Sequence, residues 1–287
     1  MDLDLDELRP LMFSIAYRMT GSVGDAEDIV QEAVIRTYRA AGQGPIESPK
    51  AFVTTTTTRL AIDHLRSARV QRESYVGTWL PEPLVSDPAP GPAERAEMSD
   101  SLSLAFLVLL ESLSPVERAV FLLREVFGYD YDEIARAVDK SEVNCRQIFT
   151  RARRHIDQGR PRFEASRRQG SELTERFLAV LRGGDLEAFI DTLAPDVVMY
   201  GDGGGKAPAG TRPVYGREKV TRLLHGLVRQ TERWAAEFHP AQVNGQPGIV
   251  AYDRDRKLFG VMAFEVLDGQ VQAIRSVINP DKLRHLQ

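Results

Sequence analysis

The sequence of 287 residues lacks features that would place it in several classes of protein. It has one cysteine, Cys145, which excludes an internal disulfide and a multi-cysteine metal site. Its longest apolar run, from Leu102 to Leu110 with one serine, is too short to span a bilayer. The N-terminus, MDLDLDELRP, is acidic, whereas targeting peptides are basic. We therefore expect a cytoplasmic protein without a membrane part, a metal site or a cofactor.

The chain also lacks an overall excess of basic residues, since its formal net charge is −4. Two short segments are nevertheless basic. Residues 50–72 contain five basic and one acidic side chain, and residues 140–170 contain nine and three. Each segment suits contact with a polyanion, and a solvated helix face is the alternative for either one alone.

Apolar residues at helical spacing predict two helices over residues 8–41, with a break at 20–24. Asp25 is the expected N-cap of the second helix, with Asp28 at its third position. Ser48-Pro49 predicts the start of another helix, which runs to about Gln71.

Helical structure is then interrupted. Five prolines between positions 81 and 92 predict an extended, polyproline-like linker over residues 75–100.

The next segment has the layout of a helix-turn-helix. Ser114-Pro-Val-Glu117 predicts a capping box, and Asp130 with Glu133 predicts the cap of a short helix. Residues 139–141 form a turn, and Ser141 caps a longer basic helix that reaches about Asp157. The second helix of this motif enters the major groove of DNA. Its expected outward face contains Asn144, Arg146, Gln147, Thr150, Arg151, Arg153 and Arg154.

The first basic segment combines cations with aromatic residues, which suits a strand with unstacked bases. It contains Lys50, Arg59, Arg66, Arg69 and Arg72, with Phe52, His64 and Tyr75 nearby. A packed helix with a solvated basic face explains the same residues equally well.

Helices followed by strands predict an α+β unit over residues 171–287. The expected helices cover 171–182, 185–193 and 216–230. The expected strands cover 197–200, 234–243, 248–253, 257–267 and 270–278. Asn244-Gly245 and Asp268-Gly269 are hairpin signals.

GDGGGK at residues 201–206 resembles a phosphate-binding loop but lacks its requirements. Tyr200 stands where a Walker loop needs its first glycine, and Ala207 replaces the Ser or Thr after the lysine. No helix opens on the last glycine, which also excludes a dinucleotide fingerprint.

In combination these motifs resemble a known family. DAEDIVQEA (25–33) and SPKAFVTTTTTRLAIDHLRSAR (48–69) are similar to regions 2.2 to 2.4 of extracytoplasmic-function sigma factors, and residues 113–156 to their region 4. Residues 171–287 resemble a SnoaL-like domain of cone-like fold. A subgroup that fuses the two has the motifs WLPEP, DGGGK and NPDKL, here at residues 79–83, 202–206 and 279–283.

The resemblance implies a multidomain fold and a function. Residues 1–74 would form region 2, an all-α domain, and residues 101–165 would form region 4, an all-α helix-turn-helix domain. Residues 171–287 would form the α+β SnoaL-like domain. The protein would direct RNA polymerase to promoters and would itself perform no chemistry, with its own C-terminal domain as an intramolecular partner. A ligand-responsive DNA-binding regulator, independent of polymerase, is the alternative.

The family's functional positions are carried over as implied roles. Docking on the clamp helices of the largest polymerase subunit is assigned to Asp25, Glu27, Asp28, Gln31 and Glu32, and the flap region of the core polymerase is a further expected partner. Contact with the −10 promoter element is assigned to Lys50, Phe52, Arg59, Asp63, Arg66 and Arg69. Contact with the −35 element is assigned to Ser141, Asn144, Arg146, Gln147, Thr150, Arg151 and Arg154.

The three subgroup motifs motivate a hypothesis of interdomain regulation, in which the glycine loop and the NPDKL motif contact the sigma segment or its linker. The residues concerned are Trp79, Leu80, Pro81, Asp202, Gly203, Gly204, Gly205, Lys206, Asn279, Pro280, Asp281 and Lys282. Trp79 could anchor this contact or pack against its own sigma domain.

Two features are less defined. Thr54–Thr58 could contact the non-template strand, although a biased repeat without a role is the favoured interpretation. Asp196, Tyr200, Asp202, His239 and Asp253 are the candidates for acid–base chemistry in the C-terminal domain, where catalysis is not expected.

Overall fold

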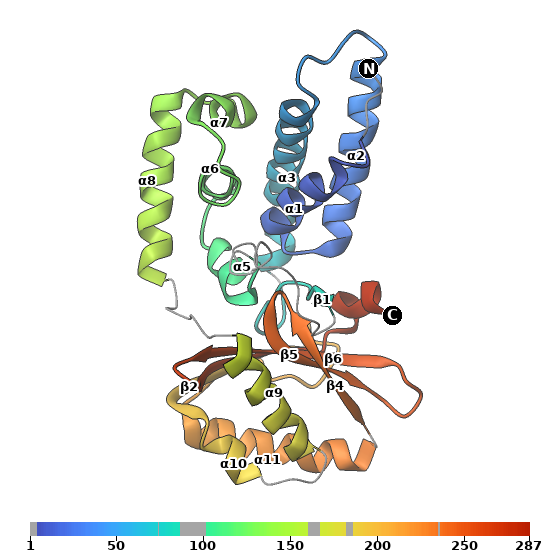
Figure 1. The fold of residues 1–287 in the computed structure, drawn as a ribbon, viewed down its shortest axis with the longest axis vertical. Coiled ribbons are helices and arrows are strands. Elements are labelled where there is room, and N and C mark those ends of the chain that lie inside the picture. The colour runs from blue at the N-terminus through green and yellow to red at the C-terminus, as the bar shows by residue number, and fades with distance from the viewer. Residues whose placement is uncertain (1–4, 74, 87–101, 160–166, 182–185, 235) are drawn as a thin grey trace. The chain divides into compact units, whose positions relative to one another are not determined.

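The computed structural model describes residues 5–73, 75–86, 102–159, 167–181, 186–234 and 236–287. The chain divides into two compact units. The helical unit comprises residues 1–74 and 106–160, and the sheet unit comprises residues 75–105 and 161–287 (Figure 1).

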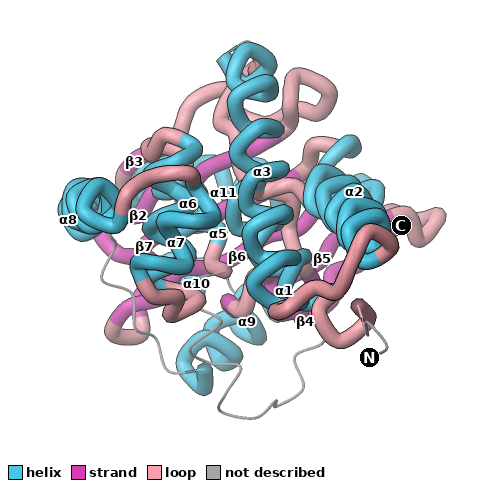
Figure 2. Tube along the Cα trace, turned by 90° about the horizontal axis from the view of Figure 1, so that it is seen from above, coloured by secondary structure: helices cyan, strands magenta, loops and turns pink. Residues whose placement is uncertain are grey.

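The first half of the helical unit contains three packed helices, α1 (Arg9–Thr20), α2 (Val23–Ala41) and α3 (Pro49–Glu73) (Figure 2). Their apolar faces meet at Met12, Val30, Ala33 and Val53, all buried. The predicted cap of α2 is wrong by three residues. Ser22 is the N-cap because its extended backbone lets the hydroxyl accept from the Asp25 N–H at 3.1 Å.

The second half contains most of α5 (Leu104–Leu110) and all of α6 (Pro115–Glu125), α7 (Tyr131–Val138) and α8 (Glu142–Gly159). Both predicted capping boxes, at Ser114 and Asp130, are present. The turn before α8 places Asp139 at a positive φ of 54°. The Ser141 hydroxyl then accepts from the Asn144 N–H at 3.2 Å and caps α8. The helix-turn-helix layout is confirmed.

Polar contacts join the two halves of the helical unit. The Thr54 and Tyr129 hydroxyls share a buried hydrogen bond of 2.7 Å, and the Arg118 guanidinium donates to the Met19 carbonyl at 2.6 Å. Thr57 and Thr58 are fully buried in α3. The interpretation of the threonine run as a repeat without a role is therefore wrong, because three of its members pack inside the helical unit.

The sheet unit is built on one mixed sheet with the strand order β1-β4-β5-β6-β7-β2-β3. The strands are β1 (Val85–Ser86), β2 (Leu193–Asp202), β3 (Val214–Tyr215), β4 (Glu237–Val243), β5 (Gln246–Tyr252), β6 (Leu258–Leu267) and β7 (Gln270–Val277). Both predicted hairpins form, with positive φ at Asn244, Gly245, Asp268 and Gly269. Only β2 and β7 pair in parallel among the described strands.

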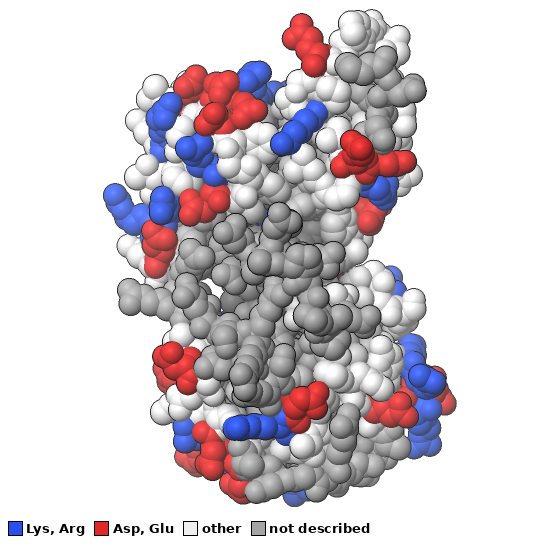
Figure 3. Space-filling view, in the orientation of Figure 1, with Lys and Arg blue, Asp and Glu red and all other residues white. Residues whose placement is uncertain are grey.

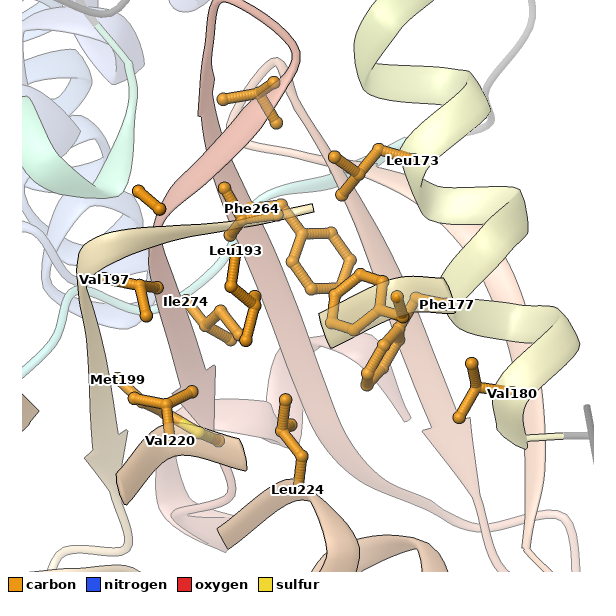
Figure 4. Close-up of a cluster of buried hydrophobic side chains, with 14 of the residues drawn as sticks. Leu173, Phe177, Val180, Leu193, Val197, Met199, Val220, Leu224, Phe264 and Ile274 are labelled. Atoms are coloured by element: carbon orange, nitrogen blue, oxygen red, sulfur yellow. The ribbon is translucent and has the colours of Figure 1, made fainter. Parts of the chain in front are cut away.

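Three helices, α9 (Arg167–Leu181), α10 (Leu186–Ile190) and α11 (Arg217–Trp234), cover one face of the sheet (Figure 1). Phe177 of α9 packs edge-on against Phe264 of β6, with ring centroids 5.3 Å apart. Val220 and Leu224 of α11 close the core from another side (Figure 4). The predicted α+β architecture is confirmed.

Several elements differ from the sequence-based expectation. The helix predicted to end at residue 193 stops at Ile190, and Leu193 already belongs to β2. The short strand β3 and the 3₁₀ helix η1 (Pro280–Leu286) were not expected. Both depend on contacts with residues distant in sequence, which the spacing of apolar residues along the chain does not predict.

The expected linker is partly built into the sheet unit. Val85 and Ser86 pair with Val243 and Gln242 of β4, so the linker supplies the edge strand β1. Residues 87–100 of the predicted linker lie outside the described residues.

Candidate nucleic-acid interface and linker site

The acidic residues predicted to dock on polymerase lie together on α2. Glu27, Asp28 and Gln31 are exposed, and Asp25 and Glu32 are half-buried. Their ion pairs are exposed: Glu27 with Arg9 at 2.6 Å and Glu32 with Arg36 at 2.7 Å. Exposed pairs contribute about 0 to 1 kcal/mol, so a partner can replace them at small cost.

Two apolar residues on the same face of α2 were missed by the sequence reasoning. Ile35 is 37% exposed and Tyr38 is 58% exposed. They lie seven and ten residues after Asp28, so they continue the row on the helix surface that begins at Asp28 and Gln31. The sequence did contain a signal for this surface, because both are large apolar residues on the polar side of an amphipathic helix.

The −10 candidates occupy different sides of α3. Phe52, Arg59, Asp63 and Arg66 share one side at helical spacing, with Asp63 and Arg66 paired at 3.3 Å. Lys50 lies on another side, 5.8 Å from the centre of the Tyr129 ring. The side chain of Arg69 lies outside the described part of the chain. The structure thus brings four of the six candidates together.

Arg59 is engaged within the helical unit. Its guanidinium donates to the carbonyl of Arg136 at 2.6 Å and to that of Ala137 at 3.1 Å. Both carbonyls belong to the last turn of α7, where unpaired carbonyls and the helix dipole attract cations. The first helix of the helix-turn-helix therefore holds an arginine predicted to contact the −10 element.

The −35 candidates lie along the exposed side of α8, while Cys145, Ile148, Ala152 and Ile156 form the predicted buried stripe. Gln147, Thr150, Arg151 and Arg154 are exposed on one face, and Asn144 is half-buried. Arg146 instead stacks 4.3 Å above the Tyr131 ring and pairs with Glu142 at 3.4 Å. Both basic and acidic side chains are present on the visible part of the helical unit (Figure 3).

One residue on α8 was missed. Val143 is 66% exposed at the N-terminal end of the helix and lies on the same face as Gln147, Thr150 and Arg154. An apolar side chain at this end of a recognition helix can contact the methyl group of thymine.

The linker site is centred on Asp202 at the end of β2, which is fully buried. Its carboxylate accepts from the Leu80 N–H at 2.8 Å, from the Lys282 ammonium at 2.7 Å and from the Tyr75 hydroxyl. Burial first, and then the Asp202 carboxylate, raise the pKa of Tyr75, so its hydroxyl stays protonated and donates. Asp202 thus joins the linker to the C-terminal motif.

Lys282 completes this site from η1. Its ammonium donates to the Leu80 carbonyl as well as to Asp202, and it lies 4.4 Å from the centre of the Trp79 ring. Tyr75 offers a second ring at 4.7 Å. A lysine buried between two aromatic rings and a carboxylate keeps the hydrogen bonds that a buried cation requires.

The glycine loop lies against the linker and against η1. The Lys206 ammonium bonds the carboxylate of Asp281, which lowers the pKa of Asp281. Asn279 donates to the Tyr75 hydroxyl at 2.9 Å and caps η1. In a phosphate-binding loop the lysine and the backbone would contact phosphate. Here Lys206 and the backbone of the loop contact protein groups instead.

Two further residues of the linker site were missed. Asn244 accepts from the Leu84 N–H at 2.9 Å and donates to the Leu102 carbonyl at 2.8 Å. His285 forms a 2.8 Å hydrogen bond with the Pro83 carbonyl. Asn244 was already explained by its hairpin turn, so the sequence offered no signal of a second contact.

The sheet unit also contains an apolar cavity of about 140 Å³, bounded by α9, α11 and the sheet. Among the described residues that line it, Arg212 is the only ionisable one. The five candidates for acid–base chemistry lie elsewhere. Asp202 is bound to the linker, Asp253 caps a turn, and Tyr200 lies beneath the Arg275 guanidinium at 4.7 Å. Asp196 and His239 are exposed on strands.

No helix in the described part of the chain is long and apolar enough to cross a membrane.

Comparison with known proteins identifies three families in order along the chain. Residues 5–70 match Sigma-70 region 2, residues 103–156 match Sigma-70, region 4, and residues 174–275 match the SnoaL-like domain. These extents overlap the regions expected from the motifs.

Two curated relatives from Mycobacterium tuberculosis are similar over almost the whole chain. The ECF RNA polymerase sigma factor SigJ is 37% identical, covering 97% of this chain and 92% of that protein. The probable ECF RNA polymerase sigma factor SigI is 34% identical, covering 97% and 93%.

A solved structure supports the same relationship. The crystal structure of the M. tuberculosis extracytoplasmic function sigma factor SigJ superposes with a TM-score of 0.76 at 34% identity and covers 98% of both chains. The match includes the helical sigma regions and the C-terminal α+β domain, and it disfavours a regulator independent of polymerase. The chain belongs to the extracytoplasmic-function sigma factors of RNA polymerase that have a fused C-terminal SnoaL-like domain.

Proposed function

We propose that this cytoplasmic sigma factor docks through α2 on the clamp helices of the core polymerase. There it presents α3 to the −10 element and α8 to the −35 element, with region 4 held at the flap. The acidic face of α2 favours a basic partner and steers its approach. Ile35 and Tyr38 add apolar area to the same row, and aromatic residues often dominate binding energy.

The docking face can be tested by capture of purified core polymerase on the immobilised full chain. Asp28→Lys and Tyr38→Ala should each weaken capture at least tenfold, since loss of an interface residue that dominates binding costs about 2 kcal/mol or more. Glu47→Lys, on an exposed loop outside the row, is the control for a change of charge. Equal capture by all variants would exclude this face.

We also propose that Arg59 exchanges its carbonyl partners on α7 for promoter DNA. Its present bonds use the last turn of α7, and phosphate oxygens are stronger acceptors for a guanidinium. Arg59→Gln should reduce open-complex formation on a promoter while leaving capture of the core polymerase unchanged. Unaltered open complexes would show that Arg59 has a role only within the helical unit.

The C-terminal domain is proposed to regulate promoter use through the linker rather than by catalysis. The observation that supports this is the buried Asp202, which binds linker residues on one side and Lys282 of η1 on the other. The linker connects the two regions that contact DNA, so its attachment influences their spacing. No acid–base candidate lines the cavity among the described residues, which favours a contact domain.

Run-off transcription with core polymerase tests the regulatory role. Asp202→Asn should change promoter output, whereas Asp196→Asn, an exposed substitution in the same strand, should not. Lys206→Gln and a chain truncated near residue 170 extend the comparison. Identical output from all four proteins and the wild type would refute regulation through the linker.

A further inference from the structure

One asparagine of the linker site is followed by a glycine. The chain contains three asparagines, and only Asn244 has this neighbour. Asn279 precedes a proline, whose backbone nitrogen has no hydrogen. The N–H that follows Asn144 belongs to Cys145 and is held in α8 by the Ser141 carbonyl at 2.9 Å. Glycine has no Cβ atom to shield its backbone nitrogen. Asn244 is therefore the asparagine best suited to lose its amide by cyclisation with the next residue.

The linker holds the side chain of Asn244 in place. This residue is 2% exposed, its side-chain oxygen accepts from the Leu84 N–H at 2.9 Å, and its NH₂ group donates to the Leu102 carbonyl at 2.8 Å. The backbone N–H of Asn244 also donates to the Leu84 carbonyl at 2.8 Å. The amide can react with the next backbone nitrogen only after it leaves both linker partners. Attachment of the linker therefore protects the asparagine.

We propose that Asn244 is a site of spontaneous deamidation that becomes reactive when the linker is released. The backbone nitrogen of Gly245 attacks the Cγ atom of Asn244, and the bond from Cγ to the side-chain nitrogen breaks. That nitrogen leaves as ammonia, with the proton that the Gly245 N–H has lost. Water then opens the cyclic imide at one of its two carbonyl groups, which leaves aspartate or isoaspartate at position 244. Water is the only other reactant.

Either product prevents the linker from returning to this position. An aspartate would place a charged acceptor against the Leu102 carbonyl in a buried site, where an unmatched acceptor is costly. Isoaspartate would lengthen the backbone between Val243 and Gln246, which pair across the turn from β4 to β5. Deamidation thus makes release irreversible. Any effect on transcription rests on the proposed linker function, but the modification and the loss of attachment do not.

Peptide mapping of the full chain by mass spectrometry, after incubation in mildly alkaline buffer, tests the proposal. Leu84→Pro removes the N–H that binds Asn244 and should accelerate its conversion at least about tenfold, because the buried amide then lacks a donor and opens more often. Asp202→Ala, which removes another attachment of the linker, should accelerate it as well. Leu84→Ala keeps the N–H and is the matched control, with the slow conversion of the wild type. Asn279 is a negative control within every digest, and the wild type unfolded in urea gives the rate of the unprotected site.

Hydrogen exchange measures the consequence of the modification. Asn244→Asp should speed exchange in residues 75–86 at least about tenfold, whereas Gln242→Glu, the same change of amide to acid on β4, should not. Equal conversion of Asn244 in the folded wild type and in both linker variants, or unchanged exchange in Asn244→Asp, would overturn the proposal. Faster exchange in Asn244→Asp without any change in run-off transcription would instead refute the proposed regulatory function and leave this inference intact.

Discussion

At the scale of single residues, the glycines of the 201–206 loop have different neighbours. A Cβ atom at Gly204 would lie 2.2 Å from the Asn279 side-chain amide and 3.0 Å from the Tyr75 hydroxyl, and one at Gly205 would touch Val76. Gly204 and Gly205 also have positive φ values of 57° and 71°. Glycine is therefore needed at these positions because other protein groups lie too close for a side chain, although the row of glycines resembles a phosphate-binding loop.

Gly204→Ala should loosen the linker. The left-handed backbone alone costs a non-glycine residue about 1–2 kcal/mol, and the contact with Asn279 adds to this cost. We expect faster hydrogen exchange in residues 75–84 and a lower free energy of unfolding in urea.

Gly226→Ala in α11 is a control for which we expect the opposite change in the free energy of unfolding. Nothing lies within 4 Å of its added methyl group. Alanine favours a helix interior over glycine by about 1 kcal/mol, so this variant should be more stable than the wild type. A Gly204→Ala protein with unchanged exchange in the linker would show that the loop can yield without releasing it.

At the scale of elements, the start of α6 depends on the reciprocal hydrogen bonds of Ser114 and Glu117. The hydrogen bond from Ser114 lowers the pKa of Glu117 below its ordinary value of 4.5. The folded state then has the lower pKa, so this contribution to stability is complete above pH 4.5 and is lost as the pH falls through the folded value.

Ser114→Ala should reduce the free energy of unfolding by about 1 kcal/mol. Glu117→Gln should be less stable than the wild type at neutral pH, and the difference should narrow below pH 4.5. Urea titrations at several pH values measure both effects. A difference that stays constant with pH would show that the charge of Glu117 does not contribute.

The recognition helix α8 supports a prediction about promoter sequence. If Val143 contacts a thymine methyl group, Val143→Ser should weaken binding to the −35 element by about 1 kcal/mol or more at a single base position. Replacement of that thymine by uracil should weaken binding by the wild type and not by the variant. Arg154→Gln, by contrast, should weaken binding to all sequences and reduce its dependence on salt. If both substitutions weakened binding equally at all promoter sequences, base recognition by Val143 would be refuted.

Elements with short-range signals were predictable, apart from the cap of α2, and those with long-range partners were not. The caps of α6, α7 and α8 and the two hairpin turns follow from residues within four positions of each other. The strand β1 exists because of β4, which lies far along the chain. The linker site was predicted from its motifs, with Asp202 among its residues, whereas the burial of Asp202 at its centre and the role of Asn244 required the three-dimensional contacts.

At the scale of the whole molecule, the described parts of the linker are held on the sheet unit on both sides of residues 87–101. Asn244 binds both Leu84 and Leu102, so the chain between them leaves and returns at the same side chain. Release of residues 75–103 would free about 30 residues, which span up to about 100 Å when extended. Attachment therefore limits the distance over which the two DNA-binding regions can separate.

Release of the linker should broaden the promoter spacings that the protein accepts. We expect Asn244→Ala and Asp202→Asn to initiate transcription on templates whose −10 and −35 elements are moved apart in steps of one base pair, where the wild type fails. Asp196→Asn should retain the narrow range of the wild type. Run-off products across such a template series measure the range, and identical profiles would contradict a spacing role.

The pairing of β1 with β4 also has a consequence for the order of synthesis. About 160 residues separate Val85 from its partner Val243 along the chain, which corresponds to about 8 to 30 seconds of translation. Region 4 is completed within this interval, at residue 156, and from then until β4 is made both sigma regions exist without the strand that receives the linker. Each new molecule thus passes through a stage in which its sigma regions precede the C-terminal domain that we propose to regulate them, and nascent chains are the population in which the proposed regulation would first be absent.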